Sequence, residues 1–287
     1  MLHRLILLLI VTSLFGPGSL PSTALAASGF NPSRVVDDSV FVNIDKMSQE
    51  DVQKFFELKG SFLKDYSENG RTAAEIIWGA AHGAGEASGN CNNTTVCSGI
   101  DINTRTGTVS SEVLLVTLQK EQSLVTMTER NDAALRSAMG YGCPDSGGCN
   151  SAFAGFTKQV EHAAWQLRFN YERAAGKGLA DYQVGQSFCM SDHNGSNCGA
   201  YENRATAALY RYTPHVYNGN FNFHHFLVTW FEQRPFSGSL FGKSPNVTLD
   251  PGGTVQLVAL VRNTGTETWS QGLPFPVRLG IVDPRDH

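Results

Sequence analysis

Residues 110–126 read SSEVLLVTLQKEQSLVT, and this stretch decides the fold of the chain. A serine at position 110 or 111 is a favoured N-cap, and most of the residues that follow are good helix formers. The stretch therefore predicts a helix that runs to about Thr126.

The apolar side chains of this helix form a stripe, and a carboxylate lies in the middle of it. At about 100° per residue, Leu114, Leu118, Glu121 and Val125 share one face. Lys120 is predicted to point well away from that face. Burial and the negative end of the helix dipole both oppose ionisation, so we expect a raised pKa for Glu121. A carboxylic acid protonated near neutral pH is what cleavage of a glycosidic bond requires. The alternative is a buried glutamate satisfied by an arginine or by backbone donors.

Cleavage of a glycoside usually needs a second carboxylate. Asp145 is the best candidate, because it lies in Gly142-Cys143-Pro144-Asp145, inside a loop that a cysteine pair would pin. The alternative for Asp145 is a turn residue that binds its own backbone. The other candidates are Glu75, Glu161 and Asp192, of which the first two equally fit the surface of a helix.

Helices alternate with polar loops around the central stretch. Residues 48–60 begin with a Ser-x-x-Asp capping box and end on a glycine, so they predict a helix. Further helices are predicted at 72–81, 131–139, 156–175 and 204–211, whereas 222–231 is predicted as a helix or a strand and 181–202 as irregular. The domain is therefore expected to be mainly α.

The six cysteines fall as close pairs along the chain. The pairs are Cys91 with Cys97, Cys143 with Cys149, and Cys189 with Cys198. An even number of cysteines in an exported chain indicates disulfides, and we expect each bond to form within its pair. Such bridges would fix the shape of loops.

The first residues have the pattern of a signal peptide. Arg4 precedes an apolar run at 5–15, and Ala24-Leu25-Ala26 fits the cleavage rule, so residues 1–26 are expected to be removed. The apolar run is about half of the roughly 20 residues that a membrane span needs, so an N-terminal anchor is the weaker alternative. We expect a secreted or cell-surface protein on the bacterial exterior, with no membrane span after removal of the signal.

Charge and aromatic content indicate the kind of ligand. The formal net charge is −4, so the chain lacks the basic character typical of proteins that bind nucleic acid. A neutral glycan would instead be held by stacking and hydrogen bonds. The side chains expected to bind it are Gln122, Tyr141, Phe153, Gln159, Asn203, Tyr212 and His215, and the alternative for each aromatic residue is a place in the core.

Two metal sites are weaker alternatives. Cys189, His193 and Cys198 would ligate zinc only if both cysteines stayed reduced. A calcium loop that starts at Asp101 is broken by Arg105, which stands where an oxygen ligand belongs. We therefore expect neither a metal nor a cofactor.

The composition of the chain changes after Phe231. We expect a helical domain over 27–234, a linker rich in proline, glycine and serine over 235–245, and β-strands over 246–287. An Ig-like sandwich needs about 100 residues, so the last segment is expected to be a partial β-sandwich.

Several motifs resemble a family of secreted bacterial proteins that are often labelled hemagglutinin-like. They are Phe30-Asn-Pro, Val113 to Thr126, Met139-Gly-Tyr-Gly-Cys-Pro-Asp145, Phe153-Ala-Gly-Phe-x-x-Gln159-Val and Ala205-Thr-Ala-Ala-Leu-Tyr-x-Tyr-Thr-Pro-His215. Those proteins resemble lysozyme-type wall hydrolases, especially endo-β-N-acetylglucosaminidases. The resemblance covers about residues 30–231 and implies that Glu121 is the acid.

The tail resembles a four-tryptophan, Ig-like module in Leu249-x-Pro251-Gly252, Asn263-Thr-Gly265-Thr-x-x-Trp269 and Val277-Arg-Leu-Gly280. Such a module would bind a protein or the wall. The resemblances together imply a mainly α, lysozyme-like domain with disulfide-pinned loops, followed by a partial Ig-like β-sandwich. It would hydrolyse or transglycosylate the β-1,4 links of peptidoglycan without a cofactor. The alternative is a carbohydrate-binding adhesin on the same fold.

Overall fold

The computed structural model describes residues 30–88, 97–144, 147–177, 180–192, 195–232, 238–243 and 259–263. The chain divides into two compact units, one of Leu25–Thr229 and the other of Met1–Ala24 with Trp230–His287. The expected signal peptide at 1–26 lies outside the described residues. Within the described ranges, no helix combines the length and the apolar character that a membrane crossing requires.

Capped helices form the first part of the helical unit. The elements are α1 (Asp38–Phe41), α2 (Gln49–Lys59), η1 (Phe62–Asp65), β1 (Ser67–Glu68), β2 (Arg71–Thr72), α3 (Ala73–Ala81) and η2 (Gly85–Ala87). The expected capping box is present, since the N–H of Asp51 donates to Ser48 Oγ and the N–H of Ser48 donates to the Asp51 carboxylate. Gly60 ends α2 in the left-handed region at φ +63°. Both helices predicted in this part are confirmed.

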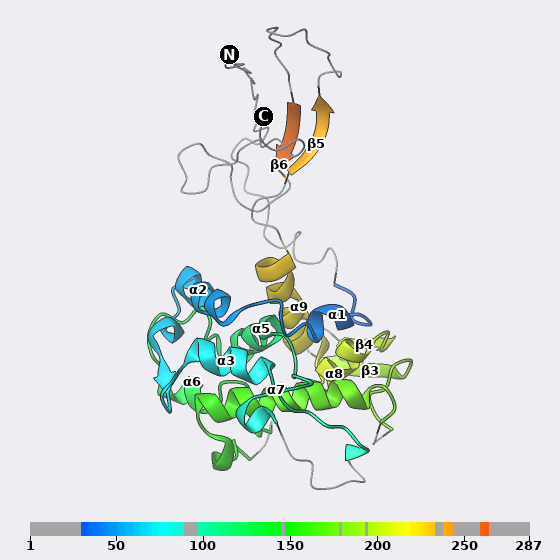
Figure 1. Cartoon of the computed structure of the whole chain (residues 1–287). Coiled ribbons are helices and arrows are strands. Elements are labelled where there is room, and N and C mark those ends of the chain that lie inside the picture. Colours follow the sequence, from blue (N-terminus) through cyan, green and yellow to red (C-terminus); the bar gives the residue numbers. More distant parts are fainter. Residues whose placement is uncertain are drawn as a thin grey trace, which may run out of the picture. The chain divides into compact units, whose positions relative to one another are not determined.

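The predicted central helix is α5 (Ser111–Gln122), capped by Ser110 and ended by Ser123 at φ +57°. It packs against α3 and α9 (Asn222–Leu227) and lies among the other helices of its unit (Figure 1). Every residue from Ser111 to Gln119 is buried, so the expected one-sided apolar stripe is wrong. Neighbouring segments cover the helix around most of its circumference, and its buried Glu112 is accordingly paired with Lys46 at 2.8 Å.

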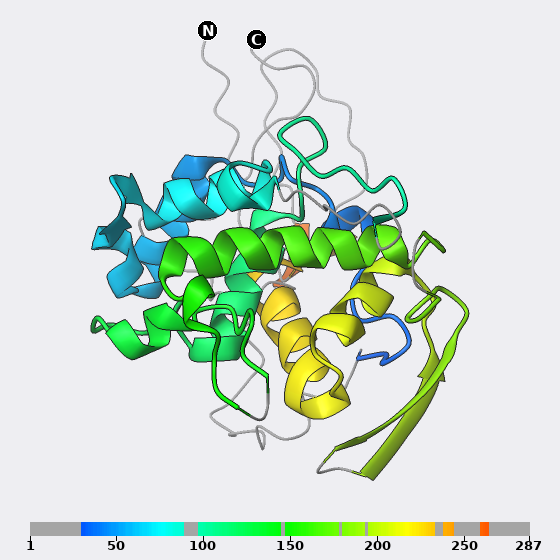
Figure 2. The same ribbon diagram turned by 90° about the horizontal axis from the view of Figure 1, so that it is seen from below.

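The second half of the unit is built on one long helix, α7 (Phe156–Arg173), which Figure 2 shows running across the unit. It contacts α3 and α8 (Arg204–Tyr212). The remaining helical elements here are α6 (Asp132–Arg136), η3 (Ser151–Phe153) and the π-helical turns η4 (Val216–Phe221) and η5 (Val228–Glu232), with α9 between the last two. Residues 222–231, predicted as a helix or a strand, are therefore helical.

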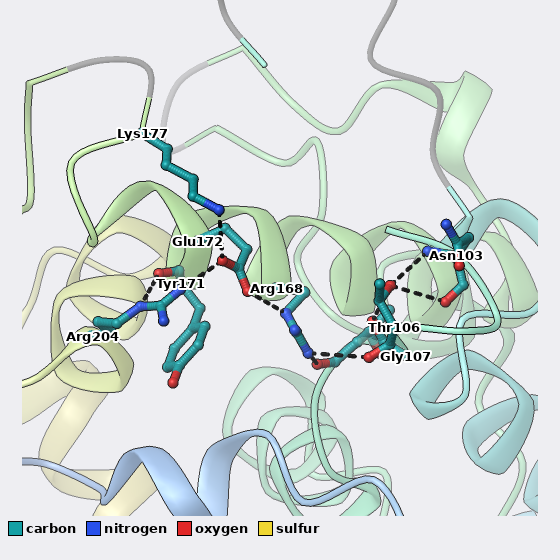
Figure 3. A network of polar contacts seen from close by, with 9 residues as sticks. Asn103, Thr106, Gly107, Arg168, Tyr171, Glu172, Lys177 and Arg204 are labelled. Atoms are coloured by element: carbon teal, nitrogen blue, oxygen red, sulfur yellow. Dashed lines mark hydrogen bonds and ion pairs between the residues drawn. The ribbon is translucent and has the colours of Figure 1, made fainter. Parts of the chain in front are cut away.

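A polar network ties α7 to its neighbours on both sides (Figure 3). Arg168 Nη1 donates to the carbonyl of Thr108 at 2.9 Å, and Arg168 Nε pairs with Glu172 at 2.9 Å. Glu172 also pairs with Arg204 at 2.7 Å and with Lys177 at 3.8 Å. One carboxylate is thus shared by three cations, and it links α7 to α8.

Residues 181–202, predicted as irregular, contain a hairpin instead. Strands β3 (Ser187–Asp192) and β4 (Gly195–Ala200) pair antiparallel with Cys189 directly opposite Cys198. The serine, asparagine and glycine content of the segment is typical of loops, which is why the strand pairing was not predicted. Backbone hydrogen bonds and the disulfide stabilise the pairing. The buried ring of Phe188 lies 4.8 Å, centroid to centroid, from the ring of Tyr210 on α8 and so anchors the hairpin to that helix.

Two of the predicted disulfides are confirmed. They join Cys143 to Cys149 and Cys189 to Cys198. Cys97 is also disulfide-bonded, while its expected partner Cys91 lies outside the described residues.

Two strands are described in the second unit. β5 (Gly238–Lys243) pairs antiparallel with β6 (Ala259–Asn263). β5 lies within the expected linker, 235–245, so that part of the linker is a strand. Its glycines and serine flank a Leu-Phe pair, and pairing with β6 outweighs the turn character of the composition. The rest of the β-sandwich expected at 246–287 lies outside the described residues.

Candidate functional site

Glu121 lies in the last turn of α5 and faces the loop that follows α6. Its side chain is 24% exposed, so the carboxylate is largely shielded and still reachable from solvent. It lies beside Gly140, whose φ is +69°. A Cβ placed on Gly140 would lie 2.9 Å from Glu121 Oε2. Gly140 therefore has a double reason to be glycine, namely the backbone angle and the room that the carboxylate occupies.

Lys120 forms an ion pair with Glu121, against the prediction that Lys120 points away. Its ammonium Nζ lies 2.5 Å from Glu121 Oε1 and donates to Thr213 Oγ1 at 2.7 Å. The Lys120 side chain is only 7% exposed. Because most of its side chain is shielded from water, the ammonium takes acceptors inside the protein. The neutral acid expected at position 121 stays a prediction.

Tyr212, the last residue of α8, lies next to Glu121. Burial above all, and then the negative charge of Glu121, raise the pKa of the Tyr212 phenol well above its usual value. The phenol therefore stays protonated, and its O–H donates a hydrogen bond to the carbonyl of Met139 at 2.7 Å. Tyr212 thus fastens the loop at 139–142 to α8, beside the carboxylate.

Gln159 on α7, which was expected to bind substrate, forms hydrogen bonds with the backbone of the same loop at 139–142. This buried side chain accepts hydrogen bonds from the N–H groups of Met139 at 3.2 Å and Tyr141 at 3.1 Å. It donates to the carbonyls of Tyr141 and Phe153, both at 2.9 Å. Its amide is fully used in the fold, so Gln159 is a positioning residue.

Tyr141 and Phe153, also predicted to bind the ligand, lie together. The Tyr141 ring stacks on His162 with 5.2 Å between centroids, and Phe153 meets Tyr141 edge-on at 4.9 Å. Burial lowers the pKa of His162, although the nearby Glu86 and Glu161 act in the opposite direction. The result is a small aromatic wall with a neutral imidazole at its base.

A pocket of about 400 Å³ opens beside this loop. It is lined by Gly140, Tyr141, Gly142, Cys143, Pro144, Gln166, Asn170, Arg211 and Tyr212. Two of these residues, Gly140 and Tyr212, also lie against Glu121. Glu121 itself is not among the lining residues, so the pocket and the carboxylate are adjacent through these two neighbours.

None of the three remaining predicted binding residues lines the pocket. Asn203 is buried, caps α8 by accepting from Thr206 N–H, and donates to the carbonyl of Val36 at 2.7 Å. Gln122 and His215 are partly exposed and lie outside the pocket lining.

Three of the four carboxylates named as candidates besides Glu121 have other partners. Asp145 lies outside the described residues, directly after the pocket residue Pro144. Glu75 caps α3. Buried Glu161 pairs with Arg71 at 2.7 Å, and Asp192 accepts from the N–H of Tyr217 at 2.8 Å.

The zinc alternative is contradicted, because Cys189 and Cys198 are bonded to each other and offer no thiolate. The calcium alternative also loses Glu112, the acidic residue at the twelfth position counted from Asp101, because Glu112 is buried and paired with Lys46. Among the described residues, no three histidine, cysteine or acidic side chains gather closely enough to hold a metal ion.

Lys120 and the pocket residues Gly140, Gln166, Asn170 and Arg211 are among those that the sequence analysis did not assign to this site. Gly140 alone gave a signal, since a glycine between methionine and tyrosine near a cysteine loop indicates a special backbone angle. Gln166 and Asn170 on α7 and Arg211 on α8 are brought together by the packing of α7 against α8, which no local pattern encodes.

Comparison with known proteins agrees with a bacterial, wall-associated role. No curated protein and no solved structure is significantly similar to the chain. The family model described as "LasA, N-terminal domain" matches residues 34–220, which is most of the helical unit. That family is one of secreted bacterial proteins that act on the cell wall. The chain belongs to the LasA N-terminal domain family.

Proposed function

We propose that the helical unit cleaves β-1,4 links of peptidoglycan with Glu121 as the general acid, and that the protein works outside the cell. The family supports the cell wall as the place of action. One observation carries the choice of residue. Glu121 is a carboxylate at the end of a buried helix, shielded but reachable, and it shares two neighbours with a ligand-sized pocket.

In the proposed reaction, Glu121 gives its proton to the glycosidic oxygen while the carbon–oxygen bond breaks. The carboxylate that remains is stabilised by the ammonium of Lys120, which Thr213 holds in place. The Tyr212 phenol stays protonated and donates its hydrogen bond to the carbonyl of Met139, so it does not compete for this role.

We assign the second carboxylate to Asp145. It follows the pocket residue Pro144 and lies in the segment that the Cys143–Cys149 bond closes. A carboxylate there would stabilise the cationic sugar or activate a water molecule. Hydrolysis and transglycosylation both fit this pair of acids.

The tail is proposed to be a non-catalytic, partial Ig-like module that binds a protein or the wall. Its support is the β5–β6 hairpin together with the motif around Trp269. A glycan-binding adhesin without turnover is the second candidate for the helical unit. The ion pair favours it, because Lys120 occupies one oxygen of Glu121.

The test is to incubate the full chain with purified insoluble peptidoglycan and to identify soluble products by mass spectrometry. Muropeptides with ordinary reducing ends would indicate hydrolysis, and anhydro ends would indicate transglycosylation. Retention on the pellet without soluble products would establish the adhesin and remove the catalytic role.

A further inference from the structure

The pocket beside Glu121 has a charged wall that the proposed reaction does not use. Arg211, near the end of α8, lines the pocket, and its side chain is 27% exposed. Its guanidinium pairs with Asp181, and Asp181 is shared with Arg173. Two guanidinium groups therefore meet one carboxylate, which leaves one positive charge at the pocket.

This positive charge has no other acid to neutralise it among its described partners. Arg173 is only 3% exposed at its side chain, and its Nε has no hydrogen-bond partner among the described residues. Burial first, and then the charge of Arg211, lower the pKa of Arg173, while Asp181 acts against this. Glu172, on the same helix, is already shared by three other cations (Figure 3).

An amide acceptor lies on the same wall. Gln166 donates to Asn170 Oδ1 at 2.8 Å, and Asn170 Nδ2 in turn donates to the carbonyl of Ala208 at 3.4 Å. This chain fixes the Gln166 amide and leaves its carbonyl oxygen to accept a hydrogen bond. An acetamido N–H of a sugar is a donor that fits such an oxygen.

We propose that this pocket binds an N-acetylated sugar that carries a carboxylate, with Arg211 on the carboxylate and Gln166 on the acetamido group. The inference rests on the proposed function and deepens it by assigning the acidic sugar of the glycan to this pocket, where the sequence analysis expected a neutral ligand. Arginine is suited to this task because its fork of donors matches a carboxylate. Since Gly140 and Tyr212 are common to the pocket and to Glu121, the acidic sugar would bind next to the bond that is cut.

The test is equilibrium binding by calorimetry, with the full chain carrying Glu121→Gln so that no ligand is consumed. One probe is a tetrasaccharide that alternates N-acetylglucosamine and N-acetylmuramic acid. The other is the same tetrasaccharide with its carboxylates reduced to alcohols. The acidic probe should bind about tenfold more tightly, which corresponds to about 1.4 kcal/mol. Arg211→Gln should remove this preference while leaving the affinity for the reduced probe nearly unchanged.

A matched control is Arg105→Gln, which removes the same charge from an exposed Arg–Asp pair, with Asp101, outside the pocket lining. It should keep the preference. Arg211→Lys retains the charge without the forked donors, so its preference for the acidic probe should lie between those of Arg211→Gln and Arg105→Gln. If Arg211→Gln melts early, Arg211→Lys replaces it in the test. Equal affinities for the two probes, no binding of either, or a preference that survives Arg211→Gln would overturn the inference. A preference found in a chain that releases no products would instead disprove catalysis and keep the acidic-sugar site.

Discussion

At the residue scale, the meaning of Glu121 depends on what lies one residue away. A helical projection separates Lys120 from Glu121 by about 100° and puts the lysine outside the apolar stripe. In the structure the Lys120 side chain is only 7% exposed, and its ammonium lies against two acceptors, Glu121 and Thr213. The proposed chemistry rests on this local arrangement, in which Thr213 holds the Lys120 ammonium beside the shielded Glu121 side chain, where it would stabilise the carboxylate left after proton transfer.

Gly140→Ala tests whether the room beside the carboxylate matters. The new Cβ would collide with Glu121 Oε2, so we expect release of wall fragments to fall about a hundredfold. The left-handed backbone should by itself reduce stability by about 1 kcal/mol. Gly60→Ala is the matched control, since Gly60 has a similar φ of +63° and no atom near its missing Cβ. Equal activities of the two variants would mean that Gly140 serves the backbone alone.

His162 should make stability depend on pH. Burial lowers its pKa below the ordinary 6.5, so the unfolded chain takes up a proton at a higher pH than the folded chain does. The stabilising contribution is present above pH 6.5 and is lost as the pH falls from there toward the lowered pKa. We expect His162→Phe, which keeps a ring against Tyr141, to reduce the drop in melting temperature between pH 7.5 and pH 5.5. An unchanged drop would assign the acid sensitivity to other groups.

At the element scale, the site is assembled by α5, α7, α8 and the loop at 139–142. Gln159 on α7 and Tyr212 on α8 both bind the backbone of that loop, and the loop places Gly140 against α5. Gln159, which was expected to contact a ligand, thus supports the loop and does not line the pocket. The geometry of the site therefore depends on helix packing more than on the loop sequence.

Gln159→Leu should loosen this assembly. It removes four hydrogen bonds and leaves backbone groups of the loop unpaired, so we expect a loss of about 2–4 kcal/mol. For a unit of this size that is a fall of about 5–15 °C in melting temperature. Gln53→Leu, at a partly exposed position on α2, should change it by a degree or two. A shift no larger than that of the control would show that the loop holds its shape without Gln159.

Some elements of the fold can be predicted from local sequence signals, and others cannot. Capping boxes at Ser48 and Thr72 and the apolar run after Ser110 are local signals, and the helices they predict are present. The β3–β4 hairpin has no local signal, because its residues are typical of loops and its pairing depends on Cys189 lying opposite Cys198. The enclosure of α5 and the arrival of Arg211 at the pocket arise from packing between distant segments.

At the scale of the whole molecule, the chain has two units that differ in how they can be stabilised. The helical unit buries a continuous set of apolar side chains, among them Phe41, Phe56, Phe156 and Phe223. The described residues of the second unit beyond Glu232 form a two-stranded antiparallel sheet, which on its own is at best marginally stable in water. The helical unit should therefore fold without the tail.

Removal of all residues after Phe236 tests this independence. We expect the melting midpoint of the helical unit to move by only about 2 °C, because the unit boundary falls at Thr229. Peptidoglycan turnover per bound molecule should persist, while retention on the wall should weaken if the tail binds it. A loss of about ten degrees or more would place the tail in the core of the first unit.

The most direct test of the central claim is Glu121→Gln in the full chain, measured by mass spectrometry of sugar fragments released from purified peptidoglycan. The amide keeps the shape of the side chain but cannot donate the catalytic proton, so release should fall to background while melting temperature and glycan binding stay close to those of the parent. Glu129→Gln, on the exposed surface, should retain full release. Undiminished turnover by the Glu121→Gln chain would contradict the assignment of Glu121 as the general acid.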